Sequence, residues 1–250
     1  MPIAIGLAVG FFTVGLSTGI IYQEHILPEI HKQKLDELLR EGNVQEFNKL
    51  RKEVKDKLVF EKIKLSNAKL GGINLESVHL RDSEFIKTDF VGLDYAGIDF
   101  DSTRIQNFIY SMSKVNSNIK NPLFEVGLKK STNLSNAYMP GTNLHASRFL
   151  VADLANINLE NVDLSKVGML AVNMSNSNLK NTNFTYSIIL DSDLSHANMY
   201  NADLSFANFT LTDFTGANLT NANLSQTDLR YVKNLPISTD EAKEKGALID

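Results

Sequence analysis

The sequence predicts an all-β solenoid preceded by α-helices, one of which is a single transmembrane helix. Three observations lead to this prediction. A large apolar residue recurs at every fifth position over most of the chain after residue 60. Residues 1–23 form an apolar opening segment, and residues 24–59 form an amphipathic segment between the two.

The opening segment has the length and composition of a membrane-spanning helix. No charged side chain occurs before Glu24, and about 20 apolar residues suffice to cross the hydrocarbon layer. The segment contains two glycine pairs at four-residue spacing, Gly6 with Gly10 and Gly15 with Gly19. Each pair would lie on one helix face and let another helix approach closely. A cleaved secretory signal and a buried helix are the alternatives.

Flanking charge predicts the orientation of this helix. Lys32 and Lys34 follow the segment, whereas only the α-amino group precedes it. Because basic residues are enriched on the cytoplasmic side, we expect the N-terminus outside and the repeat domain on the cytoplasmic or equivalent organelle side. The predicted localisation is therefore a single-pass membrane protein.

Residues 24–59 are expected to form two amphipathic helices. Leu35, Leu38 and Leu39 begin an apolar pattern with three- and four-residue steps, and the residues between them are mostly charged. The break is expected at Glu41–Asn43, where Gly42 interrupts the pattern. We interpret this segment as a cap on the open end of the solenoid; a partner-binding helix is the alternative.

The five-residue period predicts the solenoid. Large apolar residues run at this spacing from Leu65 to Tyr110 and again from Leu134 to Leu229, usually with a small or β-branched residue two positions earlier. Neither a helix nor a strand has this period. A backbone that turns a corner every five residues does, with about 20 residues per coil and about 4.8 Å between coils. The large residue and the small one would point inward.

These repeats resemble the pentapeptide-repeat family, whose consensus is A(D/N)LXX. Residues 152–156, 202–206 and 217–221 match it closely, as ADLAN, ADLSF and ANLTN. The resemblance covers residues 60–231 and implies a right-handed quadrilateral β-helix. Some members of that family look like duplex DNA and bind type II topoisomerases. Such mimicry depends on a strongly acidic rod, whereas basic residues here cancel most of the acids.

The repeats are expected in two stacks, at residues 60–115 and 134–231. Residues 116–133 would interrupt them, with candidate contact residues at Asn121, Pro122, Lys129 and Lys130. This segment is either a tolerated bulge or a loop that contacts a partner. Residues 232–250 are expected to form a C-terminal cap, because Ser238 and Glu241 have capping-box spacing before a short helix. That helix would carry Ala242, Ala247 and Leu248.

One wall of the second stack is predicted to carry an apolar ladder at outward positions. The ladder comprises Leu150, Val151, Leu170, Ala171, Ile188, Leu190 and Leu211. Exposed apolar stripes usually mark interaction sites. The ladder would contact a foreign protein, or be covered by the chain's own N-terminal helices or by a homodimer partner.

Composition excludes several kinds of chemistry. The chain has 250 residues, no Cys and a formal net charge of −4. Absence of Cys excludes a disulfide framework, a thiol nucleophile and a zinc–thiolate site. The five His residues have no metal-like spacing, and we find no phosphate-binding Gly loop or nucleophile elbow. We expect no enzyme activity, metal, cofactor or nucleic-acid partner.

The predicted function is therefore that of a non-catalytic, membrane-anchored scaffold or accessory subunit. It would attach through residues 1–22 and present a rigid β-helix to other subunits of a larger membrane complex, such as a respiratory or photosynthetic one. Two alternatives remain open: a DNA-mimicking topoisomerase-binding protein, and a secreted effector that inserts into a host membrane.

Overall fold

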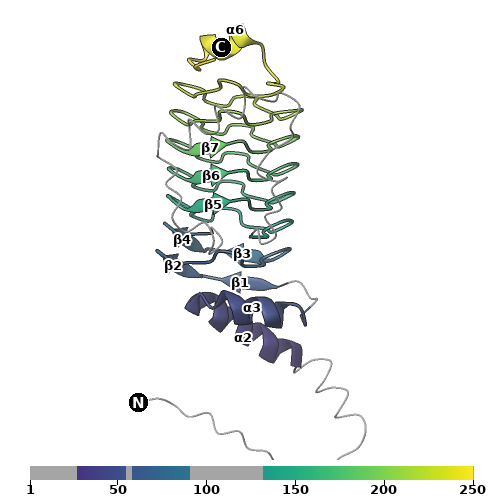
Figure 1. Ribbon diagram of the computed structural model, residues 1–250. Coiled ribbons are helices and arrows are strands. Elements are labelled where there is room, and N and C mark those ends of the chain that lie inside the picture. The colour runs from purple at the N-terminus through teal and green to yellow at the C-terminus, as the bar shows by residue number, and fades with distance from the viewer. Residues whose placement is uncertain (1–26, 55–57, 91–131, 250) are drawn as a thin grey trace, which may run out of the picture.

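The computed structural model describes residues 27–54, 58–90 and 132–249. These residues form a column of stacked coils with helices at both ends (Figure 1). The helices are α2 (Leu27–Glu41), α3 (Val44–Arg51) and α6 (Thr239–Glu244). The strands are β1 (Val59–Glu61), β2 (Lys64–Ser66), β3 (His79–Arg81), β4 (Glu84–Ile86), β5 (Arg148–Leu150), β6 (Gly168–Leu170) and β7 (Ile188–Leu190).

Each coil is square because the backbone enters the left-handed region at every fifth residue. Asn156, Asn161 and Lys166 have φ values of 56°, 59° and 56°, and the series continues to Tyr231. Residues 20 positions apart then pair in parallel, as Asn158 does with Asn178. The amide of Leu159 donates to the carbonyl of Asn178 at 2.9 Å. The predicted coil of about 20 residues is confirmed for the described residues.

The core is the column of side chains inside the coils. Leu154, Phe184 and Leu204 are fully buried, as predicted for the fifth-position residues. Aromatic rings of different walls contact one another there: Phe209 lies 5.9 Å from Phe184 and 5.5 Å from Phe214. Because burying apolar area is worth about 25 cal/mol per Å², this continuous core is the main source of stability.

The boundary between the two predicted stacks differs from the prediction. Asn133 pairs with Asn74, and Arg148 pairs with Asp89, so the ladder passes directly from the coil ending at Phe90 to the coil beginning at Thr132. The Thr132 hydroxyl donates to the Phe90 carbonyl at 2.7 Å. Residues 91–115, which were predicted to continue the first stack, lie outside the described residues. Thr132 and Asn133 belong to a coil, whereas the sequence placed them in the interrupting loop.

The helices α2 and α3 cap the first coil, as predicted. Leu35, Leu39 and Phe47 are fully buried in the same core as the coils. Polar side chains of the helices bond the open edge. Arg40 donates to the carbonyls of Glu61 (2.9 Å) and Lys62 (3.2 Å). Exposed strand edges invite pairing with other chains, so these bonds also protect against aggregation.

The break between the two helices also lies where the sequence predicted it. Helix α2 ends at Glu41, and Gly42 has a φ of 69°. Asn43 caps α3 by accepting a hydrogen bond from the amide of Glu46. Asn side chains favour this N-cap position because they satisfy an amide that has no partner within the helix.

The opposite end is closed by α6 and the residues after it. Ser238 caps the helix by accepting from the amide of Glu241 at 3.1 Å. The helix ends at Glu244, so Ala247 and Leu248 are not part of it, contrary to the prediction. Instead, Leu248 pairs with Asp228 and extends the ladder by one more rung. Gly246, with a φ of 85°, turns the chain back onto the coils.

The predicted membrane helix lies outside the described residues. The described helices begin at Leu27, and none of them is both long and apolar enough to cross a bilayer. The glycine pairs Gly6 with Gly10 and Gly15 with Gly19 also fall outside the described residues.

Replacing Asn48 by Ala should weaken the N-terminal cap. The Asn48 amide donates to the Gly72 carbonyl at 2.7 Å, and its oxygen accepts from the Asn74 amide at 2.8 Å. Loss of both partly buried bonds should lower the free energy of unfolding by about 1–3 kcal/mol. Denaturant unfolding measures this change. Gln45→Ala, at an exposed position of the same helix, is the control, and an equal loss in both variants would contradict the capping role.

Candidate functional site

Most polar side chains on the walls bond their own turns. In repeat after repeat, an Asn or Asp carboxamide or carboxylate oxygen accepts from the amide two residues later, as Asp153 does from Ala155 (3.1 Å) and Asn158 does from Glu160 (3.0 Å). Asn side chains also donate to the coil below: the Asn173 amide reaches Asp153 at 3.2 Å. Short polar side chains favour such turns. These side chains therefore stabilise the backbone of the turns and link adjacent coils.

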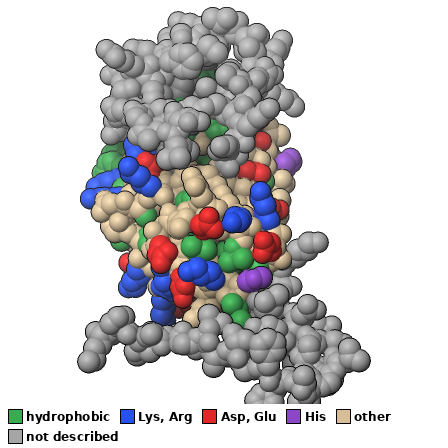
Figure 2. Space-filling view, turned by 60° about the horizontal axis from the view of Figure 1, so that its bottom comes forward, with side chains coloured by type: hydrophobic (Ala, Val, Ile, Leu, Met, Phe, Trp, Pro, Cys, Tyr) green, Lys and Arg blue, Asp and Glu red, His purple; other side chains and the backbone are tan. Residues whose placement is uncertain are grey.

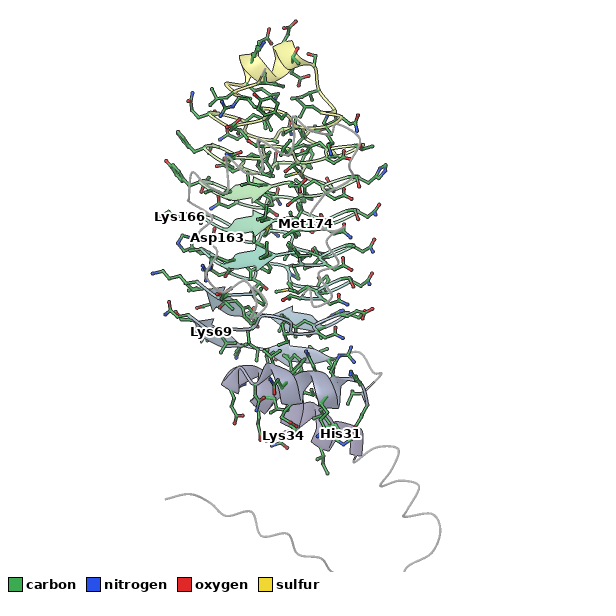
Figure 3. All side chains as sticks on the ribbon, in the orientation of Figure 1. His31, Lys34, Lys69, Asp163, Lys166 and Met174 are labelled. Atoms are coloured by element: carbon green, nitrogen blue, oxygen red, sulfur yellow. The ribbon has the colours of Figure 1, made fainter. Side chains whose placement is uncertain are left out.

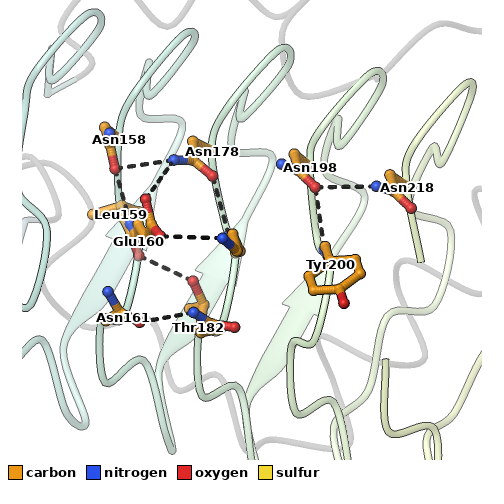
Figure 4. A network of polar contacts seen from close by, with 11 residues as sticks. Asn158, Leu159, Glu160, Asn161, Asn178, Thr182, Asn198, Tyr200 and Asn218 are labelled. Atoms are coloured by element: carbon orange, nitrogen blue, oxygen red, sulfur yellow. Dashed lines mark hydrogen bonds and ion pairs between the residues drawn. The ribbon is translucent and has the colours of Figure 1, made fainter. Parts of the chain in front are cut away.

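One wall adds a network of longer side chains to this pattern (Figure 4). The Asn178 amide donates to the Glu160 carboxylate at 3.2 Å, and Lys180 lies 3.7 Å from the same carboxylate. The Lys180 ammonium is also 6.0 Å from the centre of the Tyr200 ring. The cation is thus shared between a carboxylate and a ring, so this network links adjacent coils.

Side chains of opposite charge are mixed on the face seen in Figure 2. Several basic residues pair with an acid of the adjacent coil: Lys64 with Glu84 (3.3 Å), Arg81 with Glu61 (3.6 Å) and Lys180 with Glu160 (3.7 Å). Exposed pairs contribute little stability. They neutralise charge locally, because each of these basic side chains lies beside an acid of the adjacent coil.

A Ser, a His and an Asp come together on another wall but do not form a catalytic triad. The Nδ1 atom of His145 lies 2.7 Å from the Ser165 hydroxyl and 4.0 Å from the Asp163 carboxylate. In a triad the serine and the carboxylate contact opposite ring nitrogens. Here both contact the same nitrogen, so the imidazole cannot relay a proton between them. The described residues also contain no group of three or more side chains arranged to hold a metal ion.

The predicted apolar ladder points outward, as expected, but it is not exposed. Strands β5, β6 and β7 form a three-stranded parallel sheet on its wall. Five of the ladder residues are at most 4% exposed: Leu150, Val151, Leu170, Ala171 and Leu190. Ile188 and Leu211 are half-buried. The prediction of an exposed stripe is therefore wrong for this wall.

No described helix packs on the ladder wall. Helices α2 and α3 lie at one end of the column and α6 lies at the other (Figure 1). Covering of the ladder by the chain's N-terminal helices therefore does not involve α2 and α3, and the predicted helix in residues 1–23 lies outside the described residues. The other predicted contact residues, Asn121, Pro122, Lys129 and Lys130, lie outside the described residues and stay a prediction.

A buried carboxyl sits at the edge of the same wall. Asp191 occupies the corner position that Val151 and Ala171 occupy in the coils below, and it is 8% exposed. Burial raises its pKa to about 6, an effect that the positive charge of Lys233 partly opposes. Desolvation disfavours the ionised carboxylate. The corner therefore holds a group that is costly to charge.

The most exposed apolar group of the described walls is a pair of aromatic rings that sequence reasoning missed. Tyr186 and Phe206, here called the aromatic corner, are 57% and 51% exposed. Their rings stack in parallel, 4.9 Å apart and 6° from coplanar. Reading every twentieth residue along this corner would have found them. The column there is Ala146, Lys166, Tyr186, Phe206 and Gln226.

Replacing Leu170 by Asp should destabilise the isolated chain. The side chain is 4% exposed, so the variant would bury a carboxylate among apolar residues and lose at least about 3 kcal/mol of unfolding free energy. Thermal or denaturant unfolding measures the loss. Thr220→Asp, at an exposed site of another wall, should change stability by less than about 0.5 kcal/mol. Equal stability of the two variants would mean that the ladder is open to solvent.

Replacing Asp191 by Asn should change the pH dependence of stability. Since the folded chain holds this proton more tightly than the unfolded chain, wild-type stability should fall as pH rises from about 4 to 6. Above pH 6 the full penalty is about 3 kcal/mol, from 1.36 kcal/mol per unit of pKa shift. The Asn variant should be more stable than wild type at pH 7.5 and show no such gain at pH 3.5. Parallel stability curves of the two proteins would contradict burial of the charge.

Comparison with known proteins agrees with this architecture. A family profile for pentapeptide repeats matches eight copies, at residues 60–94, 130–165, 171–199 and 197–232. No curated protein sequence matches the chain.

Several solved structures are similar to parts of the chain. A pentapeptide repeat protein from Nostoc Pcc 7120 is 27% identical over 41% of this chain and 84% of its own, with a TM-score of 0.38. HetL from the cyanobacterium Nostoc sp. strain PCC 7120, involved in heterocyst differentiation regulation, is 19% identical over 70% of this chain and 71% of its own, with a TM-score of 0.26.

Full-length QnrB1, a plasmid-mediated fluoroquinolone resistance protein, is also similar. It is 14% identical over 77% of this chain and 93% of its own, with a TM-score of 0.29. All three TM-scores are too low to support a shared function or partner. The family profile matches more than half of the residues, and the coils have the geometry that such repeats require. The chain therefore belongs to the pentapeptide repeat family.

Proposed function

We propose that this protein is a non-catalytic scaffold that binds other proteins through the walls of its solenoid. The observation that carries the proposal is the aromatic corner, where Tyr186 and Phe206 are more than half exposed. Exposed aromatic residues are enriched where proteins bind one another. The polar groups around them bond turn backbone or adjacent coils, which suits a rigid binding surface better than a reacting one.

The ends of the column support the same proposal. Both ends are covered, by α2 and α3 at one end and by α6 with its following rung at the other. Covered ends disfavour edge-to-edge assembly. The walls are therefore the surfaces that remain for binding other proteins. A rigid wall also loses little conformational entropy on binding, because the coils are already held by hydrogen bonds at each corner.

Attachment to a membrane is the second part of the proposal. It is supported by residues 1–22, which carry no charged side chain and are long enough to span the hydrocarbon layer. In this proposal the protein is an accessory subunit of a membrane complex, with the solenoid on the side of the membrane where the basic residues Lys32 and Lys34 lie.

The proposal predicts that the full chain resists carbonate extraction and migrates in a high-mass band on a native gel in mild detergent. Gly10→Lys in the full chain is the control, because a charge at the centre of the span costs about 3 kcal/mol and should release the protein into the supernatant. A wild-type chain that is extracted as a monomer would overturn the scaffold proposal. Equal retention of both proteins would overturn the membrane attachment.

A further inference from the structure

The aromatic corner lies at a backbone position that disfavours aromatic residues. Tyr186 and Phe206 have φ values of 58° and 59°, in the left-handed region. Non-glycine residues are strained there, and Asn is tolerated better than residues with bulky side chains. Asn is the most frequent residue at the equivalent corners of the described coils, at Asn67, Asn136, Asn156, Asn161, Asn176, Asn181, Asn201 and Asn221. The two rings therefore occupy positions at which the fold itself favours a small polar residue.

The two rings contribute little to the packing of the fold. Neither ring belongs to the buried core, and each contacts the other rather than the interior. At the preceding corner, Asn181 donates to Asn161 at 2.9 Å and so links two coils without backbone strain from a large side chain. Strain that the fold does not need is typical of functional sites. The exposed rings are thus better explained by recognition than by folding.

A cation lies next to the rings in the same column. Lys166 is one coil below Tyr186, is exposed, and projects from the edge of the stack (Figure 3). Its ammonium makes no ion pair with any described residue. On the coil of Phe206, the Asp203 carboxylate accepts from the Ser205 hydroxyl at 2.7 Å and from the Asn223 side-chain amide at 3.0 Å. The column therefore presents a positive charge followed by an apolar patch.

We propose that Lys166 and the aromatic corner bind an extended segment of another protein that presents a carboxylate and an apolar or aromatic side chain on one face. The carboxylate lies against Lys166 and the apolar side chain against the rings. Coils are about 4.8 Å apart, so the middle of the ring pair, one and a half coils from Lys166, is about 7 Å away. An extended chain advances about 3.3 Å per residue, so the two side chains are two residues apart in the segment. That spacing places both on the same face of a strand. This inference rests on the proposed scaffold function.

The test is selection of displayed random peptides on the immobilised full chain, followed by fluorescence anisotropy with the selected peptides. Counter-selection uses the double variant Tyr186→Asn with Phe206→Asn. It introduces the residue that is most frequent at the left-handed corners, so it should fold normally. Tyr138→Asn, which removes an exposed aromatic from another wall, is the matched control. Selected peptides should contain Asp or Glu two residues from Phe, Tyr, Trp or Leu.

The expected results are specific. The double variant should bind these peptides at least tenfold more weakly than wild type, and Tyr138→Asn should bind them as wild type does. Lys166→Glu should lose them and instead select peptides with Lys or Arg at the acidic position. Peptides that ignore the charge of residue 166, or that bind the double variant equally well, would overturn the proposal.

Two further outcomes would also overturn it. A wild-type mass in light scattering that corresponds to a dimer, and that becomes monomeric in the double variant, would assign the corner to a second copy of the chain. Binding of wild type, but not of the double variant, to anionic phospholipid vesicles would assign it to a membrane surface. If the double variant keeps the high-mass band on the native gel, this inference fails and the scaffold function stands. If the wild-type protein is itself a monomer on that gel, the scaffold function fails.

Discussion

The parallel hydrogen-bond ladder between coils is the constraint on which the rest of the structure depends. A residue can pair with the one 20 positions later only if every coil has the same length and turns at the same places. The left-handed corner at each fifth residue meets that requirement. Once the corners are set, the side chain midway between two corners must point inward, and Leu, Met or Phe there forms a continuous buried core. Local conformation, core packing and the sequence period are thus three consequences of one geometric rule.

The same rule limits what the walls can do. Asn and Asp bond the turns, Ser and Thr hydroxyls bond carbonyls of neighbouring coils, and oppositely charged side chains pair across adjacent coils. A wall built in this way is stiff, because its described polar side chains are held by these bonds. Residues that depart from this pattern are therefore the best candidates for a functional role. The ladder wall departs by having Leu at outward positions, and these residues are buried in the chain. The aromatic corner departs by having rings at strained positions, and these remain exposed.

The two ends meet a different physical demand, because the last coil on each side has backbone groups with no further coil to pair with. Side chains of α2 and α3 supply donors and acceptors at one end, including Arg40 and Asn48. At the other end the chain itself returns, so that Leu248 pairs with Asp228 as an additional rung. A solenoid closed in both ways leaves its walls as the surfaces for recognition, which is why the proposed contacts lie there.

The sequence by itself determined the solenoid, its inward-facing residues, the two N-terminal helices and their break at Gly42, because these follow from periodicity and local backbone preference. It could not determine which coils are neighbours across the interruption: the pairing of Asn74 with Asn133 depends on contacts between distant residues. Nor could it determine exposure. Ala171 and Tyr186 both occupy left-handed corners of the repeat, yet one is 0% and the other 57% exposed. Only the tertiary structure decided this difference, since exposure depends on what the whole chain places over a wall and not on the residue's place in its repeat.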